Sequence, residues 1–264
     1  MKILITGGSG FIGQHLMELF PDAFGYDLKD SNDILDTENL LAYMDGSDIV
    51  IHLAALVSVE ESKREPLKYL SNNIIGTTSV LECAIKSGVK RIIYASSAAC
   101  YDPSSSPYAL SKYSSELLMQ VYRDMIHTTS LRFFNIYGTG QNPHYGAVIT
   151  AFHKGIENKE ITIYGNGKQT RDFTAVEDVC RSIKLATEVD IPSGEVIDIG
   201  TGRETPVFKL ATIMSDILKK EPKVNFAPAR KEIKYSVADT NKAKILLGFE
   251  ANISLEEGLI NLLK

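Results

Sequence analysis

The feature that most constrains the fold of this chain is a glycine-rich turn almost at its N-terminus. An apolar run over residues 2–5 is long enough for one buried strand and too short for a helix. Three glycines follow at once, and apolar residues then recur at helical spacing. A strand, a glycine turn and a helix form the layout of a dinucleotide-binding βα unit. Gly7 allows a tight turn, Gly10 lets backbone N–H groups approach a pyrophosphate, and Gly13 lets the helix pack close on the strand.

An acidic residue downstream makes this glycine pattern more specific. Glycines alone are weak signals, because they also occur in ordinary turns. Asp27 lies twenty residues past Gly7 and directly follows a second apolar run, residues 23–26. An acid at that distance is part of the dinucleotide-binding pattern. We therefore expect a bound dinucleotide.

Composition excludes several other classes of function. The chain has 264 residues and a net charge of −5, with no Lys/Arg cluster, so we expect no nucleic-acid partner. No apolar run approaches the ~18 residues of a membrane span, and the first strand begins too early for a signal peptide. Three cysteines without metal-type spacing indicate reduced thiols in the cytoplasm and no metal site.

Strand and helix signals alternate along the first half of the chain. Further strands are expected over residues 48–53, 91–95 and 129–133, and helices over about 66–86 and 108–127. Strands separated by helices imply right-handed crossovers and a parallel sheet with helices on both faces. The expected fold class is therefore α/β, a Rossmann-type doubly wound parallel sheet.

The pattern changes after residue 138. We expect a strand at 161–164, a helix from a capping box at Thr174-x-x-Glu177 to about residue 188, a strand at 196–200, and helices from Thr205-Pro206 and at 255–262. Residues 1–160 would form the dinucleotide-binding domain, to which 174–200 return. Residues 161–264 would mostly form a smaller substrate-binding lobe over the carboxyl edge of the strands, where ligands bind in such sheets.

Tyr108 and Lys112 are the first candidates for catalysis. They stand four residues apart on an expected helix, so their side chains share one face. A phenol with a reference pKa of ~10 is a poor base, but a nearby ammonium and an oxidised nicotinamide both favour the phenolate. Ser96 and Ser97 directly follow a strand at the edge where the cofactor would lie. Tyr/Lys pairs are also common on helix surfaces without function; the glycine turn and the strand-end serines favour catalysis here.

Several motifs together resemble the extended short-chain dehydrogenase/reductase family. They are Thr6-Gly7-Gly8-Ser9-Gly10-Phe11-Ile12-Gly13, Asp33-Ile34, His52-Leu53-Ala54-Ala55, Ser96-Ser97, Tyr108-x-x-x-Lys112 and Leu131-Arg132-Phe133-Phe134-Asn135. The likeness continues through Thr170-Arg171-Asp172-Phe173 and Asp198-Ile199-Gly200-Thr201-Gly202. Within the family, the chain is similar to the NAD-dependent nucleotide-sugar epimerases and dehydratases, UDP-glucose 4-epimerases included. The resemblance implies NAD as cofactor, a nucleotide-diphosphate sugar as substrate and a homodimer.

The resemblance also implies roles for individual residues in holding NAD. The pyrophosphate would lie on Gly7, Gly10, Phe11, Ile12 and Gly13. Asp27 would bind the adenosine ribose and favour NAD over NADP, a preference that nearby Lys29 could weaken. The remaining contacts would be Asp33 and Ile34 at the adenine, Leu53, Ala54 and Ala55 along the cofactor, and Asn72 and Phe134 at the nicotinamide half. For Asp33 an Asx turn is an alternative, for Asn72 a structural hydrogen bond, and His52 fits a strand end better than a base.

For the reaction, the resemblance implies Ser97, Tyr108 and Lys112 as catalytic residues. Ser97 fits better than Ser96, because the run Ser97-Ala98-Ala99-Cys100-Tyr101 is similar to the family's Ser-Ala-x-x-Tyr. Tyr108 would be the acid/base, and Lys112 would bind the nicotinamide ribose and tune the tyrosine. Asn135, Arg171 and Arg230 would contact the substrate, as Ser97 would. For Arg230 a solvated charge is an equal alternative, because its surroundings depart from the family's run.

Two departures from the family bear on the reaction. Only ten residues separate Ser97 from Tyr108, where relatives usually carry a substrate-facing loop. Ala98-Ala99 replaces the Asp-Glu pair of the 4,6-dehydratases, which disfavours dehydration. We therefore expect a nucleotide-sugar 4-epimerase that works through a transient 4-keto sugar. The alternatives are a reductase of nucleotide 4-keto-sugars that consumes NADH or NADPH, and a non-catalytic NAD-binding sensor, which would have no use for a proton relay.

Overall fold

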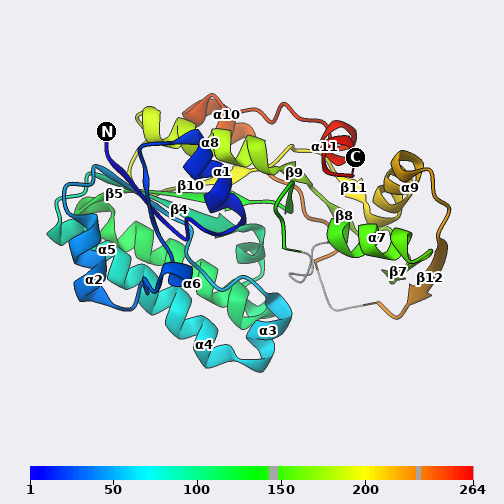
Figure 1. The fold of residues 1–264 in the computed structure, drawn as a ribbon, viewed down its shortest axis with the longest axis horizontal. Coiled ribbons are helices and arrows are strands. Elements are labelled where there is room, and N and C mark those ends of the chain that lie inside the picture. Colours follow the sequence, from blue (N-terminus) through cyan, green and yellow to red (C-terminus); the bar gives the residue numbers. More distant parts are fainter. Residues whose placement is uncertain (143–147, 230–232, 264) are drawn as a thin grey trace.

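A six-stranded parallel sheet forms the centre of the computed structural model, which describes residues 1–142, 148–229 and 233–263 (Figure 1). The strand order is β10-β5-β4-β3-β1-β2, and every neighbouring pair is parallel. The strands are β1 (Ile3–Thr6), β2 (Phe24–Tyr26), β3 (Ile49–His52), β4 (Arg91–Ser97), β5 (His127–Phe133) and β10 (Glu195–Ile199). The expectation of an α/β, Rossmann-type sheet is confirmed.

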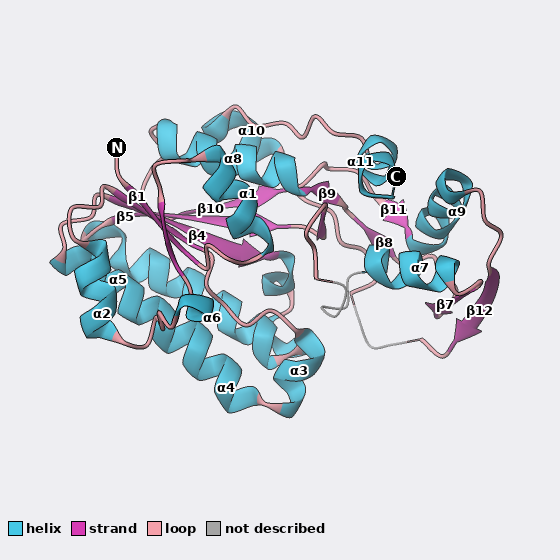
Figure 2. Cartoon of the chain, viewed as in Figure 1, coloured by secondary structure: helices cyan, strands magenta, loops and turns pink. Residues whose placement is uncertain are grey.

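Helices cover both faces of this sheet (Figure 2). One face carries α1 (Phe11–Leu19), α8 (Val176–Glu188) and α10 (Asn241–Leu247), and the other α2 (Thr37–Met44), α5 (Gly76–Lys86) and α6 (Pro107–Val121). Successive side chains of β1 point to alternate faces of the sheet: Ile3 and Ile5 belong to one core cluster, and Leu4 belongs to the other. Continuous apolar strands are therefore expected, because both faces are buried.

The long helix expected over residues 66–86 is present but is not uniform. It begins as α4 (Pro66–Leu70), passes through a π-helical turn at Ser71–Ile75 and continues as α5. A short helix, α3 (Val59–Arg64), precedes it. The expected helix from residue 108 ends earlier than 127, at Val121, and a 3₁₀ turn follows. π turns often mark functional positions in helices.

A second, smaller lobe lies beyond the carboxyl ends of the parallel strands, toward which the arrows of the sheet point in Figure 2. It contains α7 (Val148–Glu157), β7 (Glu160–Tyr164), α9 (Val207–Leu218), β12 (Lys223–Ala227) and α11 (Leu255–Leu263). Four two-residue strands connect it to the sheet: β6 (Ile136–Tyr137), β8 (Thr170–Arg171), β9 (Thr174–Ala175) and β11 (Thr205–Pro206). Its core is a separate cluster that includes Phe152, Ile163 and Leu210.

The two structural units do not divide the chain at a single boundary. Helix α7 packs in the core of the lobe although it precedes residue 160. Helix α10 lies near the end of the chain, yet Ala243 and Leu247 belong to a core cluster of the sheet. The chain therefore crosses between the units several times, which fixes the lobe over the strand ends.

One local expectation is wrong. Thr174 does not cap α8, because it lies buried in β9 and pairs with Ile136 of β6. The residue at the N-cap of α8 is Ala175, which has no hydroxyl to offer. The pairing of β6 with β9 thus overrides the local capping pattern at this position.

Buried carboxylates fasten the lobe to the sheet. Asp172 is fully buried and accepts hydrogen bonds from the backbone N–H groups of Thr201, Gly202 and Ala238 at 2.9–3.2 Å. Asp178 on α8 accepts from the backbone of Asn252 and Ile253 in the segment that leads into α11. Hydrogen bonds to a buried charged acceptor are stronger than those to a neutral one. Asp172 and Asp178 therefore fix the segments around residues 201–202, 238 and 252–253.

Within the described ranges, the helices are too short or too polar for any of them to span a bilayer.

Candidate active site

The glycine turn between β1 and α1 is a tight cradle. Gly7 has φ +76°, and a Cβ there would lie 2.8 Å from the backbone nitrogen of Ala54. A Cβ on Gly13 would lie 2.2 Å from the carbonyl oxygen of Gly7. Both positions therefore exclude any side chain. Gly10 occupies the N-cap of α1 and, lacking a side chain, leaves the start of the helix open to a ligand. Phe11 and Ile12 form the first turn of that helix.

Asp27 is tied directly to this turn. One of its carboxylate oxygens accepts from the backbone N–H of Ser9 at 3.0 Å, and the other accepts from the N–H of Lys29 at 2.9 Å. The Lys29 ammonium reaches across the turn and donates to the carbonyl oxygen of Ser9 at 2.9 Å. The acid that would face a ribose is therefore held in place, with a cation beside it.

The next predicted contacts, Asp33 and Ile34, lie in the connection after β2. A carboxylate oxygen of Asp33 accepts from the N–H of Leu35 at 2.9 Å, so the structure contains the Asx turn that the sequence allowed as an alternative. The Ile34 side chain is buried and contacts Gly76 of α5. Because its side chain is buried, Ile34 could contact an adenine only through its backbone.

The segment Leu53–Ala55 follows β3 and is held from two sides. The N–H of Ala54 donates to the Thr6 hydroxyl at 3.3 Å. One residue past the segment, Leu56 is clamped by the Asn73 amide, which accepts from its N–H at 2.9 Å and donates to its carbonyl at 3.0 Å. Asn72, the predicted contact, is half-buried and donates to the Asn73 side chain at 3.0 Å.

Asn73 is a residue that sequence reasoning missed. It is 1% exposed, sits within the π turn and also donates to the hydroxyl of Ser111 on α6 at 2.9 Å. A signal was present: Tyr69, Asn73 and Thr77 recur at spacing four, and all three are buried on one side of the long helix. A buried amide in such a row needs polar partners, which marks it as an organising residue.

Ser97, Tyr108 and Lys112 meet where β4 ends and α6 begins. Ser97 is the last residue of β4, Tyr108 lies in the first turn of α6, and Lys112 follows one turn later. The Tyr108 hydroxyl hydrogen-bonds with Ser97. Lys112 is 3% exposed; its ammonium donates to the carbonyl oxygen of Ala95 at 2.8 Å and lies 4.8 Å from the ring centroid of Tyr94.

Burial dominates the ionisation of these groups. It raises the pKa of Tyr108 to about 12, while the hydrogen bond with Ser97 acts in the opposite direction. Burial also lowers the pKa of Lys112 to about 8. Without a further positive charge nearby, the phenol is therefore held neutral, and a cation beside it would be needed to make it a proton acceptor.

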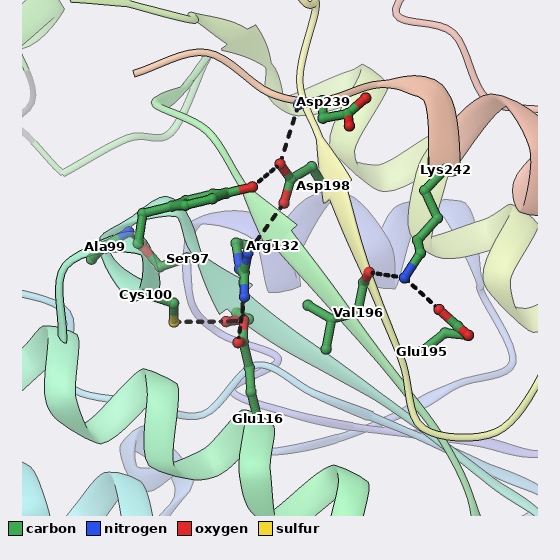
Figure 3. A network of polar contacts seen from close by, with 12 residues as sticks. Ser97, Ala99, Cys100, Glu116, Arg132, Glu195, Val196, Asp198, Asp239 and Lys242 are labelled. Carbon is green, nitrogen blue, oxygen red and sulfur yellow. Dashed lines mark hydrogen bonds and ion pairs between the residues drawn. The ribbon is translucent and has the colours of Figure 1, made fainter. Parts of the chain in front are cut away.

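Ser96 differs from Ser97 in its partner. Its hydroxyl donates to the carboxylate of Glu116 on α6 at 2.5 Å, and the same carboxylate accepts two bonds from Arg132 of β5 at 2.7 and 3.0 Å. Figure 3 shows Arg132 between Glu116 and Asp198. Ser96 is therefore committed to a structural ion-pair network, which leaves Ser97 as the serine available for catalysis.

The short link between Ser97 and Tyr108 is anchored to the same network. It consists of two 3₁₀ turns, and the Tyr101 hydroxyl within it donates to the carboxylate of Asp198 on β10 at 2.6 Å. The guanidinium of Arg132 lies 4.6 Å from the centroid of the Tyr101 ring. The link thus turns toward β10 and ends at Ser106, whose hydroxyl caps α6.

The predicted substrate residues come from both structural units. Phe134 and Asn135 follow β5; Phe134 is buried, and Asn135 has φ +26°, a strained conformation of the kind that concentrates at functional sites. Arg171 lies in β8 of the lobe, where its guanidinium donates to the carbonyl oxygens of Thr170 and Ile233. Arg230 lies outside the described residues.

Comparisons with known proteins agree with this geometry. A family model described as the NAD dependent epimerase/dehydratase family matches residues 3–200. A UDP-glucuronate 4-epimerase of Thermodesulfobacterium geofontis is 32% identical over 97% of this chain and 93% of its own length. That alignment spans 307 positions, more than the 264 residues of this chain, so the relative carries segments that are missing here.

Solved structures are similar over the whole chain. A UDP-glucose 4-epimerase from Thermotoga maritima, determined with UDP-glucose, superposes with a TM-score of 0.92, 32% identity and coverage of 100% of this chain and 97% of that one. MoeE5, in complex with UDP-glucuronic acid and NAD, superposes with a TM-score of 0.91 and 29% identity, and the match covers 100% of this chain and 98% of that one. The chain belongs to the NAD-dependent epimerase/dehydratase family. It is an NAD-dependent enzyme of nucleotide-sugar chemistry, and its glycine cradle fits that cofactor.

Proposed function

We propose that this protein is an NAD-dependent 4-epimerase of a nucleotide-diphosphate sugar. The observation that carries the proposal is the meeting of Ser97, Tyr108 and Lys112 at the carboxyl edge of the sheet that also holds the glycine cradle. Relatives named as UDP-sugar 4-epimerases support the type of reaction.

Tyr108, Ser97 and Lys112 have separate roles in the proposed proton transfer. Tyr108 takes the proton from the C4 hydroxyl of the sugar and later returns it, while Ser97 hydrogen-bonds the same oxygen. Lys112 binds the nicotinamide ribose and favours the phenolate of Tyr108. NAD, held on the glycine cradle and Asp27, would supply the hydride acceptor and donor for C4, so that hydride could leave one face of the sugar and return to the other. Between the two transfers the 4-keto sugar turns over in the pocket.

The cofactor and substrate contacts in this proposal follow the positions described above. Gly7, Gly10, Phe11, Ile12 and Gly13 hold the pyrophosphate. Asp27 binds the adenosine ribose, and the connection at Asp33 and Ile34 adjoins the adenine. Leu53, Ala54 and Ala55 line the cofactor, with Asn72 and Phe134 at its nicotinamide half. For the substrate diphosphate we propose Asn135 and Arg171, because a guanidinium suits phosphate oxygens.

A reductase of nucleotide 4-keto-sugars is the second candidate, and the short link over residues 98–106 keeps it open, since it shortens the segment in which relatives usually carry a substrate-facing loop. Incubation with NAD and a panel of nucleotide sugars, with NMR analysis of the products, separates the two. An epimerase gives a mixture of C4 epimers with no net NADH. A reductase leaves these sugars unchanged and consumes NADH or NADPH stoichiometrically when given a 4-keto sugar.

We further propose a homodimer that pairs through α6. This helix exposes Leu110, Leu117 and Val121 along one side, with 44%, 44% and 67% of each residue accessible. Analytical ultracentrifugation should show two 29.1-kDa chains per particle, and Leu117→Asp should give monomers because it places a charge in the buried contact. Ile245→Asp, at a 79% exposed site on α10, is the matched control. A monomeric wild type would contradict the proposal.

The expected compartment is the cytoplasm. Cys83, Cys100 and Cys180 are buried free thiols, which suits a reducing environment.

A further inference from the structure

A buried chain of hydrogen bonds runs through His52, which the proposed mechanism does not use. His52 ends β3, is 1% exposed and lies with its ring centroid 5.6 Å from that of Tyr94. Its Nδ1 is 2.7 Å from the Thr6 hydroxyl, and its Nε2 is 3.1 Å from the Thr77 hydroxyl. Thr6 is the last residue of β1, the strand that leads into the glycine turn, whereas Thr77 belongs to α5. The imidazole therefore connects two different elements.

The hydroxyl partners fix which ring nitrogen carries the proton. The Thr77 hydroxyl donates its only hydrogen to the carbonyl oxygen of Asn73 at 2.6 Å, so toward His52 it can only accept. His52 must then donate from Nε2, which leaves Nδ1 unprotonated and ready to accept from Thr6. Thr6 in turn accepts from the N–H of Ala54. All the donors of the chain thus point one way, from Ala54 through His52 to Asn73.

The two ends of this chain hold the same loop. Thr6 binds Ala54, and Asn73 clamps Leu56 through both of its backbone groups. From Asn73 the network continues to α6, because Asn73 donates to the Ser111 hydroxyl, which donates to the carbonyl oxygen of Tyr108 at 2.8 Å. The loop expected to line the cofactor and the helix that carries the catalytic tyrosine are therefore held by one set of hydrogen bonds.

We propose that His52 is a positioning residue: as a neutral imidazole protonated at Nε2, it sets the cofactor-lining loop 53–56 relative to the Tyr108 helix. This inference rests on the proposed contact between that loop and NAD. Burial, and after it the charge of Lys112, lowers the pKa of His52 to about 3, so the ring stays neutral at physiological pH. In this role His52 transfers no proton, and it contacts neither NAD nor the nucleotide sugar.

Thr77→Val tests the proposal without touching the loop itself. Valine keeps the shape of threonine but removes the acceptor for His52, which leaves a buried N–H unpaired. We expect the Kd for NAD, measured by isothermal titration calorimetry, to rise by about tenfold. The Kd for UDP should stay unchanged, since only the cofactor loop is released. Thr77→Ser keeps the hydroxyl and should restore the wild-type NAD affinity.

The chain offers a matched control one residue further on. The Thr78 hydroxyl makes the same kind of bond, to the carbonyl oxygen of Ile74 at 3.0 Å, and Thr78→Val should leave the NAD affinity unchanged. Thr6→Val interrupts the series of hydrogen bonds at its other end. In the double variant with Thr77→Val, the two losses of NAD affinity should not add.

Three results would overturn the proposal: unchanged NAD affinity in Thr77→Val, equal losses of NAD and UDP affinity, or additive losses in the double variant. If Thr77→Val fails to fold, Thr6→Val with its partner Thr6→Ser gives the same comparison, and equal NAD affinity in that pair would overturn the proposal too. Failure of the wild type to bind NAD would instead remove the proposed cofactor contact on which the inference rests.

Discussion

Tyr108→Phe should lower kcat for epimerisation by roughly 10³-fold, because it removes the only hydroxyl assigned to take and return the C4 proton. Tyr108 is 9% exposed and lies at the start of α6, so phenylalanine keeps the volume of the ring and the fold. The Kd for NAD should change by less than about twofold, since the glycine cradle and Asp27 remain intact. Steady-state kinetics together with calorimetric titration of NAD measure both quantities.

The matched control for this variant is Tyr113→Phe. Tyr113 lies on the same helix, one residue past Lys112, and is only half-buried. Its hydroxyl has no assigned role, so kcat should match the wild type. Substantial activity in Tyr108→Phe would remove the proposed base, and an equal loss in both variants would point to damage of α6 instead of lost proton transfer.

Lys112→Met should destroy activity and yet stabilise the ligand-free protein. Lys112 is 3% exposed, and burial lowers the pKa of its ammonium from 10.5 to about 8. At 1.36 kcal/mol for each pKa unit, the folded state disfavours the charged form by about 3 kcal/mol. Methionine avoids this cost but loses the hydrogen bond to Ala95, so we expect a net gain of about 2 kcal/mol at pH 7. We expect kcat to fall by at least about 10²-fold.

The pH dependence of stability gives an independent check on Lys112. Its folded pKa lies below its unfolded pKa, so between pH 8 and 10.5 the unfolded chain binds more protons at this site than the folded one. The contribution of Lys112 to the free energy of unfolding therefore rises with pH across that window. Urea titrations at several pH values should show the stability advantage of Lys112→Met shrinking from pH 8 to 10.5. A constant advantage for Lys112→Met across that window would contradict the account.

The central sheet could be predicted from the sequence because its strands are buried on both faces. Residues 3–5 and 49–51 are continuous apolar runs for that reason, and the glycine turn follows the strand that contains the first of them. Helices α2 and α7 were not predicted, although their signals exist: Ile149, Phe152 and Ile156 are buried in α7 at spacings of three and four. Short amphipathic helices next to turns are easily lost among loop residues when only long periodic segments are counted.

The errors at finer scale arise from tertiary structure. Thr174 has the right neighbours for a helix cap, but its pairing with Ile136 places it in a strand. Asn72 and Asn73 are adjacent, and the π turn at Ser71–Ile75 adds a residue to the helical repeat there. A pattern of period 3.6 alone therefore does not decide which of the two amides turns inward, whereas the row of Tyr69, Asn73 and Thr77 at spacing four favours Asn73. In the structure Asn73 is buried, and the Asn72 side chain donates a hydrogen bond to it.

The most direct measurement of the central claim follows the hydrogen at C4. With the nucleotide sugar that the protein epimerises, labelled with deuterium at C4 and incubated in ordinary water, NMR should show full retention of the label at C4 of the product epimer. Retention is expected because hydride leaves C4 and returns to it without exchange, while Tyr108 handles only the hydroxyl proton. Loss of the deuterium to solvent, or no epimer from any nucleotide sugar of a broad panel, would contradict the account.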